Sequence, residues 1–154
     1  MEALLISACL LGENCKYNGG NNALPREILD ELRQRYRLVP VCPEVLGGLP
    51  IPRSPSERRG ASVFSCDGRD VTEAYRRGAD ISLRLARQEG CRLALLKERS
   101  PSCGPDGIYD GTFSHRVIPG PGVTAELLTA RGISVFGESQ ILVLLGKHPN
   151  LSNS

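Results

Sequence analysis

The first twelve residues read MEALLISACLLG, and the apolar run ALLIS at 3–7 gives the first indication of the fold. A short run that is apolar at almost every position is typical of a strand buried on both faces of a parallel sheet. The run is too short to span a bilayer, and it follows an acid instead of a basic segment. The stretch therefore predicts a buried first strand in a cytoplasmic protein that makes no membrane contact.

Outward from this strand, short apolar runs alternate with helical patterns. Further strands are expected at RLVPV (37–41), ASVFS (61–65), RLALL (92–96) and ISVFG (133–137). Helices are expected from Pro25 to about Tyr36, from an N-cap at Asp70 to Gly90, and over 122–132. The alternation predicts an α/β fold, a single-domain three-layer sandwich with a mostly parallel, Rossmann-like sheet.

Two stretches show neither a clear helical pattern nor a clear strand pattern. Residues 43–60 are rich in proline and glycine and are expected to be irregular, while SQILVLLG (139–146) fits a closing helix or a strand. We expect one domain over 1–154, with a core at about 3–138 and a loose C-terminal tail at 146–154.

Size and charge limit the classes of function. The chain has 154 residues, enough for one domain with its own core, and 19 basic against 17 acidic residues give a net charge of +2. This balance gives no general attraction to nucleic acid or to anionic membrane, so neither is expected as a partner. No pattern in the sequence specifies an oligomeric state.

The cysteines carry the strongest indication of chemistry. Six cysteines in a reducing compartment more often bind metal or catalyse a reaction than form disulfides. Parallel α/β sheets bind ligands beyond the carboxyl ends of their strands. Cys9, Cys42 and Cys103 each follow a predicted strand, so their thiols are expected to converge on one edge of the sheet.

The other three cysteines are placed differently. Cys91 precedes its strand and is expected to be structural at the opposite edge, and Cys66 lies in a CDG turn where its presence is incidental. Cys15 lies six residues after Cys9, in a loop that begins at the edge of the sheet where the three thiols are expected. It could be a fourth ligand, a spare thiol or a structural loop residue.

Cys9, Cys42 and Cys103, called the trio below, have a spacing that excludes the commonest zinc motifs. The chain contains no CxxC pair, and its imidazoles are His115, expected at the surface, and His148 in the tail. A single cysteine often packs as a small hydrophobe, but three after three strands are better explained by a ligand. Three thiolates without a fourth ligand suit an iron–sulfur cluster with one open iron, which is a catalytic arrangement.

The chain also resembles a known family. The blocks SACLLGENCKYNGG, PVCPEVLGGLPIPR, GRDVTEAYRRGA, LLKERSPSCG and IYDGTFS are similar, in this order, to the thiouracil desulfidases of the TudS type. These are small bacterial proteins formerly catalogued as a domain of unknown function. The resemblance runs from about Leu5 to Glu138, which is nearly the whole chain.

The resemblance implies a 4Fe-4S cluster held by three cysteines. Carried over to this sequence, the ligands are Cys9, Cys42 and Cys103, although the motif also contains the position of Cys15. It implies an enzyme that takes the sulfur from a thiolated pyrimidine, thiouracil or thiouridine, and gives the oxo compound and hydrogen sulfide. The expected partner is therefore a small molecule.

This chemistry needs a base for the attacking water and donors for the substrate. Glu44, two residues after Cys42, is the expected general base, although it could instead cap a turn. Ser100 is expected to be catalytic, and Ser102 and Lys97 to bind substrate. Turn-forming serines and a surface lysine are the alternatives. Asp110, in YDG, is expected to form a turn.

Two other functions use the same cysteines. One is a non-catalytic metal or redox-sensing module that stores or reports a metal. The other is a zinc hydrolase. An iron–sulfur desulfidase remains the leading hypothesis.

Overall fold

The centre of the computed structural model, which describes residues 1–147, is a four-stranded parallel sheet. Its strand order is β2 (Tyr36–Val41), β1 (Glu2–Ser7), β5 (Leu93–Leu96) and β8 (Ser134–Gly137). Ser7 pairs with Val41 and Leu96 pairs with Gly137, so the strands end at nearly the same level. The four strands expected for the main sheet are confirmed.

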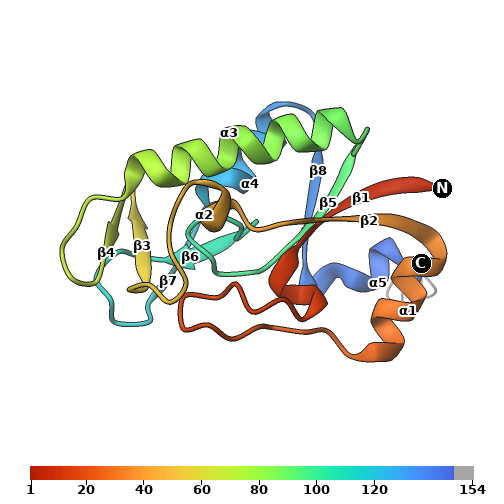
Figure 1. Cartoon of the computed structure of the whole chain (residues 1–154), viewed down its shortest axis with the longest axis horizontal. Coiled ribbons are helices and arrows are strands. Elements are labelled where there is room, and N and C mark those ends of the chain that lie inside the picture. Colours follow the sequence, from red (N-terminus) through yellow and green to blue (C-terminus); the bar gives the residue numbers. More distant parts are fainter. Residues whose placement is uncertain (148–154) are drawn as a thin grey trace.

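Helices cover both faces of this sheet (Figure 1). Ala3 and Leu5 of β1 pack in a core with α3 (Thr72–Gln88) and α4 (Val123–Ala130). Leu4 and Ile6 face the opposite way, into a core with α1 (Arg26–Arg35) and α5 (Ile141–Leu144). Successive residues of a strand point to opposite faces, and both faces of β1 are apolar because both are covered. The predicted three-layer α/β sandwich is confirmed.

The long helix α3 begins at Thr72, so its N-cap is Val71, one residue after the expected Asp70. Asp70 still acts at this end of the helix, because its carboxylate accepts the backbone N–H of Thr72 at 3.0 Å. One face of α3 carries small, mostly apolar residues, and Gly78, Ala79 and Ser82 on this face are buried.

A short helix, α2 (Pro43–Leu46), packs directly on α3 through two glycines. A Cβ atom at Gly78 would lie 1.9 Å from the carbonyl oxygen of Pro43, and one at Gly47 would lie 2.0 Å from that of Ala74. No side chain fits at either place. The two backbones are therefore in contact, and this contact fixes where the start of α2 lies.

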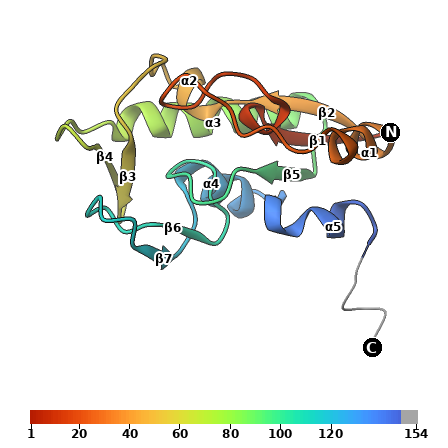
Figure 2. The same ribbon diagram turned by 90° about the horizontal axis from the view of Figure 1, so that it is seen from below.

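Two antiparallel hairpins stand at one end of the molecule (Figure 2). They are β3 (Ser56–Arg59) with β4 (Ser62–Ser65), and β6 (Gly107–Tyr109) with β7 (Val117–Pro119). The strand expected at 61–65 is confirmed as β4. The expectation of irregular backbone over 43–60 is wrong, because α2 and β3 lie there. Hairpin β6–β7 was not expected, since strands of three residues show no alternation.

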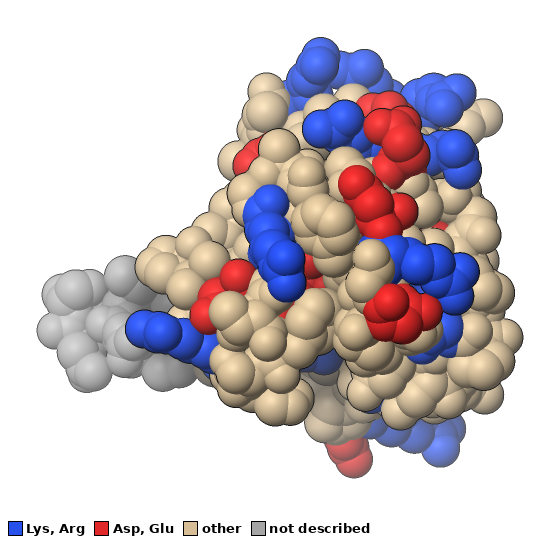
Figure 3. Space-filling view, turned by 90° about the vertical axis from the view of Figure 1, so that its left-hand side faces the viewer, with Lys and Arg blue, Asp and Glu red and all other residues tan. Residues whose placement is uncertain are grey.

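Near the C-terminus, SQILVLLG forms the short helix α5 and not a strand. Of the expected tail at 146–154, residues 148–154 and with them His148 lie outside the described residues. No helix in residues 1–147 has the length and apolar character needed to cross a membrane. Figure 3 shows acidic and basic side chains interspersed on the end of the molecule that carries the hairpins.

Candidate active site

One cavity of about 640 Å³ opens at the carboxyl edge of the parallel sheet. Cys9 lines it from η1 (Ala8–Leu11), the 3₁₀ turn that follows β1. Cys42, the single residue between β2 and α2, lines it as well. Cys103 reaches it from the loop after β5. The structure thus brings together the three thiols that strand placement selected, from three neighbouring strands.

Cys15 lies in the same cavity, between two members of this trio. The interaction with its thiol is the main cause that lowers the pKa of Cys9 to about 7, and it also lowers the pKa of Cys42. The pKa of Cys15 itself is raised by the neighbouring side chains of Cys42 and Cys9. Four cysteine side chains therefore meet at this edge of the sheet.

Polar groups around the thiols support negative charge on sulfur. The side-chain amide of Asn22 donates to Sγ of Cys9 at 3.4 Å, and the nearby Lys97 further lowers the Cys9 pKa. Cys103 differs, since burial raises its pKa, against a hydrogen bond from Ser7 that lowers it. A cation bound at this place would favour its thiolate form.

The loop that carries Cys103 is held in a tight turn by Ser100. The hydroxyl oxygen of Ser100 accepts the backbone N–H groups of Ser102 at 3.1 Å and of Cys103 at 3.0 Å. A Cβ atom at Gly104 would lie 2.8 Å from the carbonyl oxygen of Ser100, so the turn closes only over glycine. This packing fixes the position of the buried thiol.

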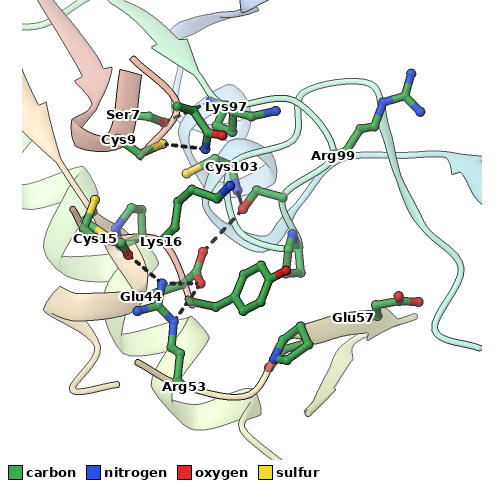
Figure 4. Close-up of a pocket in the computed structure, with 18 of the residues that line it drawn as sticks. Ser7, Cys9, Cys15, Lys16, Glu44, Arg53, Glu57, Lys97, Arg99 and Cys103 are labelled. Atoms are coloured by element: carbon green, nitrogen blue, oxygen red, sulfur yellow. Dashed lines mark hydrogen bonds and ion pairs between the residues drawn. The ribbon is translucent and has the colours of Figure 1, made fainter. Parts of the chain in front are cut away.

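Glu44 lies in the first turn of α2 and points into the cavity (Figure 4). Its Oε1 accepts a long hydrogen bond of 3.4 Å from the hydroxyl of Ser100. Its Oε2 is paired with Arg53, whose Nη2 lies 2.9 Å away. The same guanidinium donates to the carbonyl oxygens of Cys15, at 2.9 Å, and of Pro50, at 3.1 Å. Glu44 and Ser100 are thus adjacent, and both line the cavity that holds the thiols.

Lys97 and Ser102, the two expected substrate-binding residues, have different surroundings. Lys97 lines the cavity, and its Nζ contacts a carboxylate oxygen of Glu138 and the carbonyl oxygen of Glu98, both at 2.9 Å. Ser102 is completely buried, and its hydroxyl lies 2.6 Å from that of Thr124 on α4. This hydroxyl is committed to the core, so Ser102 is left out of the site proposed below.

The remaining residues singled out in the sequence are also placed. Cys91 is buried in the core on the α3 side of the sheet, as expected for a structural thiol. Cys66 is exposed and lies on the cavity wall, and His115 lines the cavity from an exposed loop. Asp110 forms a turn, because its carboxylate accepts both the N–H and the hydroxyl of Thr112.

Sequence reasoning missed several residues of the cavity. Arg53 and Asn22 lie in segments without periodicity, and only their contacts with Glu44 and Cys9 reveal them. The Tyr and Phe side chains of the cavity come from three separate parts of the chain: Tyr17, Tyr75, and the β6–β7 hairpin with Tyr109 and Phe113. Their spacing in the sequence shows nothing of this arrangement.

The donor set suits an iron–sulfur cluster. Such clusters are held by cysteine thiolates, and the cavity is lined by Cys9, Cys15, Cys42 and Cys103 at the sheet edge and by Cys66 on its outer wall. Cys9 and Cys42 have a lowered pKa. Within residues 1–147, no three His, Cys, Asp or Glu side chains converge on a point as the ligands of one ion do. Thiolates that hold a cluster surround a larger group and line a cavity instead.

Known proteins resemble this chain over most or all of its length. A model of the family described as 2-thiouracil desulfurase matches residues 4–140. The uncharacterized protein YbbK of Bacillus subtilis is 40% identical over 148 residues, which cover 90% of this chain and 97% of that protein. A solved structure, the [4Fe-4S]-dependent thiouracil desulfidase TudS (DUF523Vcz), is 44% identical with a TM-score of 0.89 and covers 100% of both chains. The chain belongs to the 2-thiouracil desulfurase family.

Proposed function

We propose that this protein is a [4Fe-4S]-dependent desulfidase that converts a thiolated pyrimidine, thiouracil or thiouridine, into the oxo compound and hydrogen sulfide. The observation that carries the proposal is one cavity lined by Cys9, Cys42, Cys103, Glu44 and Ser100. It occurs in a chain that matches a [4Fe-4S]-dependent thiouracil desulfidase along its full length at 44% identity.

Cys9, Cys42 and Cys103 would hold the cluster, in agreement with their placement after three neighbouring strands. Held by three cysteines, a [4Fe-4S] cluster would supply an open iron, which is a Lewis acid suited to soft sulfur. Cys15 lies close enough to Cys9 and Cys42 to affect their protonation, so it remains the alternative ligand.

The reaction exchanges sulfur for the oxygen of water and needs no electron donor. The thiocarbonyl and one water give a carbonyl and hydrogen sulfide, so both protons of the water leave with the sulfur. Glu44 is the proposed base that takes a proton from this water. Arg53 holds its Oε2, which leaves Oε1 on the side of Ser100.

Ser100 and Lys97 are the proposed donors to the substrate. The oxygen of Ser100 is held by its backbone contacts in the Cys103 turn, and its one proton, which points to Glu44 over 3.4 Å, would turn to the substrate. Lys97 brings a positive charge to the wall of the cavity, where charge develops on the ring as the sulfur leaves. All six cysteines are free thiols, which agrees with a cytoplasmic, reducing location.

The test is an anaerobic assay with a panel of thiopyrimidines. Protein purified without oxygen is expected to be brown, to contain iron and acid-labile sulfide, and to remove the thiocarbonyl absorbance of 2-thiouracil while sulfide appears. Colourless protein with one zinc per chain would support the zinc hydrolase instead. Brown protein that leaves every thiopyrimidine and thiouridine unchanged would support the non-catalytic module.

A further inference from the structure

The loop between β6 and β7 has an unusual backbone where it lines the cavity. Phe113 and His115 adopt positive φ angles of 60° and 61°, and Gly111 adopts 92°. Residues other than glycine rarely take this left-handed conformation, and they keep it only where the surroundings hold it. Two such residues within one short loop show that its shape is enforced from outside.

Glu57 on β3 supplies this enforcement. Its side chain is buried, and its Oε1 accepts the backbone N–H groups of Gly111 at 2.9 Å and of Phe113 at 3.1 Å. Arg59, two residues further on the same strand, donates from Nε to the carbonyl oxygen of Gly111 at 2.8 Å. A buried carboxylate with two backbone donors is a strong anchor, because charged acceptors form the stronger hydrogen bonds.

The anchored loop presents aromatic rings to the cavity. Tyr109, Phe113 and His115 all line it, and the rings of Tyr109 and His115 pack edge to face with centroids 5.5 Å apart. Figure 4 shows Glu57 on the side of the cavity away from Cys9 and Cys103. The thiols and the aromatic loop are therefore two walls of one cavity, contributed by the parallel sheet and by the hairpins.

We infer that Phe113 and His115 form an aromatic wall that binds the planar ring of the substrate and so makes the site specific for heteroaromatic thiocarbonyl compounds. This inference rests on the proposed function. A thiopyrimidine has a flat π face, and aromatic side chains stack on such faces with little dependence on the ring substituents. Glu57 acts through the loop as a positioning residue.

The two side chains of the aromatic wall have no proposed part in the chemical step. Neither ring belongs to the groups proposed to hold the cluster or to move protons, so loss of a ring weakens binding and leaves the chemical step intact. Such a loss raises KM and leaves kcat unchanged. A ring that only fills space in the fold predicts no change of KM.

Steady-state kinetics with 2-thiouracil on anaerobically purified protein test the inference. Phe113→Leu is expected to raise KM at least about 5-fold, the lower limit found for stacking of a base on an aromatic side chain. Phe113→Tyr keeps the ring and is expected to restore a KM close to that of the wild type. Phe136→Leu is the matched control, because it removes the same ring from β8, where Phe136 packs against the core.

A double substitution tests the role of Glu57. Glu57→Ala releases the loop and is expected to raise KM, while iron and sulfide content stay at the wild-type value. Because Glu57 acts through the loop, the Glu57→Ala, Phe113→Leu protein is expected to have a KM no higher than that of the weaker-binding single variant. His115→Ala is expected to raise KM in the same direction.

The outcomes distinguish the two proposals. If the wild type converts 2-thiouracil but Phe113→Leu leaves KM unchanged, or lowers kcat alone, the aromatic wall is overturned and the desulfidase stands. If the wild type, brown and loaded with iron, converts no thiopyrimidine, the proposed function fails and the wall fails with it.

Discussion

Arg53 and Glu44 form an ion pair that is almost closed to solvent. Nη2 of Arg53 lies 2.9 Å from Oε2 of Glu44, and the two side chains are only 7% and 17% exposed. The same nitrogen donates to the carbonyl oxygen of Cys15. One guanidinium thus connects the proposed base with the loop that carries Cys15.

Removal of this guanidinium leaves a carboxylate without its partner. Arg53→Met is expected to lower the free energy of unfolding by about 1.5–3 kcal/mol, the usual cost of a lost hydrogen bond to a charged group. In the double variant with Glu44→Gln no unpaired charge remains, so part of this stability should return. Thermal unfolding of the two single variants and the double variant measures this coupling, and strictly additive losses would contradict it.

Glu44→Gln separates chemistry from binding. The amide is nearly isosteric but cannot accept a proton from water at neutral pH, and loss of a general base typically lowers a rate by ~10²–10⁴-fold. Cluster content and KM are expected to stay close to wild type. Ser100→Ala is expected to reduce kcat less, since it removes one donor. Near-native turnover of Glu44→Gln, on samples matched for iron, would remove Glu44 from the mechanism.

Replacement of single cysteines identifies the ligands. Cys9→Ala, Cys42→Ala and Cys103→Ala are each expected to lose the brown cluster, because too few thiolates remain to hold it. Cys66→Ser is the control, since Cys66 is exposed at the rim of the cavity. Iron and acid-labile sulfide per chain are the measurement. Loss of the cluster in Cys15→Ala, together with its retention in one of the trio, would replace that member by Cys15.

The contact between α2 and α3 predicts an effect at a distance. Gly78→Ala places a methyl group where the carbonyl of Pro43 now lies, next to Cys42. Overpacking typically costs about 1–3 kcal/mol, more than the gain of up to about 1 kcal/mol in helix propensity. We expect lower thermal stability and lower iron occupancy. Asp80→Ala, on the exposed face of α3, should change neither, and a native iron content in Gly78→Ala would show that α2 adapts.

Ser102 and Thr124 form a buried hydroxyl pair with an effect on stability only. Ser102→Ala leaves the Thr124 hydroxyl without this partner, which typically costs about 1–3 kcal/mol. Replacement of both, with Thr124→Val, should recover most of the loss. KM for thiouracil should stay unchanged in both variants. A raised KM at unchanged thermal stability would return Ser102 to the substrate site.

The sequence predicts the central sheet well because its two inner strands, β1 and β5, are apolar runs buried on both faces. Ala3, Leu4, Leu5 and Ile6 are all buried, and a run of this kind is recognisable without any tertiary information. The carboxyl-edge rule then places Cys9, Cys42 and Cys103 near one another. The elements that the sequence does not reveal are α2, β3 and the hairpin β6–β7, which have three or four residues each and no period.

The rest of the site depends on contacts between distant segments. Ser100 and Ser102 are two residues apart and look equivalent in the sequence, but one hydroxyl meets Glu44 and the other meets Thr124. Arg53 is one of many arginines until its pairing with Glu44 is seen. Local patterns cannot distinguish these cases, because they are decided by which helix or loop packs on each side chain.

The three thiols of the trio are joined only by the pairing of β2, β1 and β5, which brings together parts of the chain that are far apart in sequence. An unfolded chain therefore holds no preassembled chelate, and a cluster bound by the trio binds the native state alone. By mass action, occupancy then adds directly to the free energy of unfolding. Chains that lack iron open more often and are the first to reach proteases. Iron supply would in this way control the abundance of the protein as well as its activity.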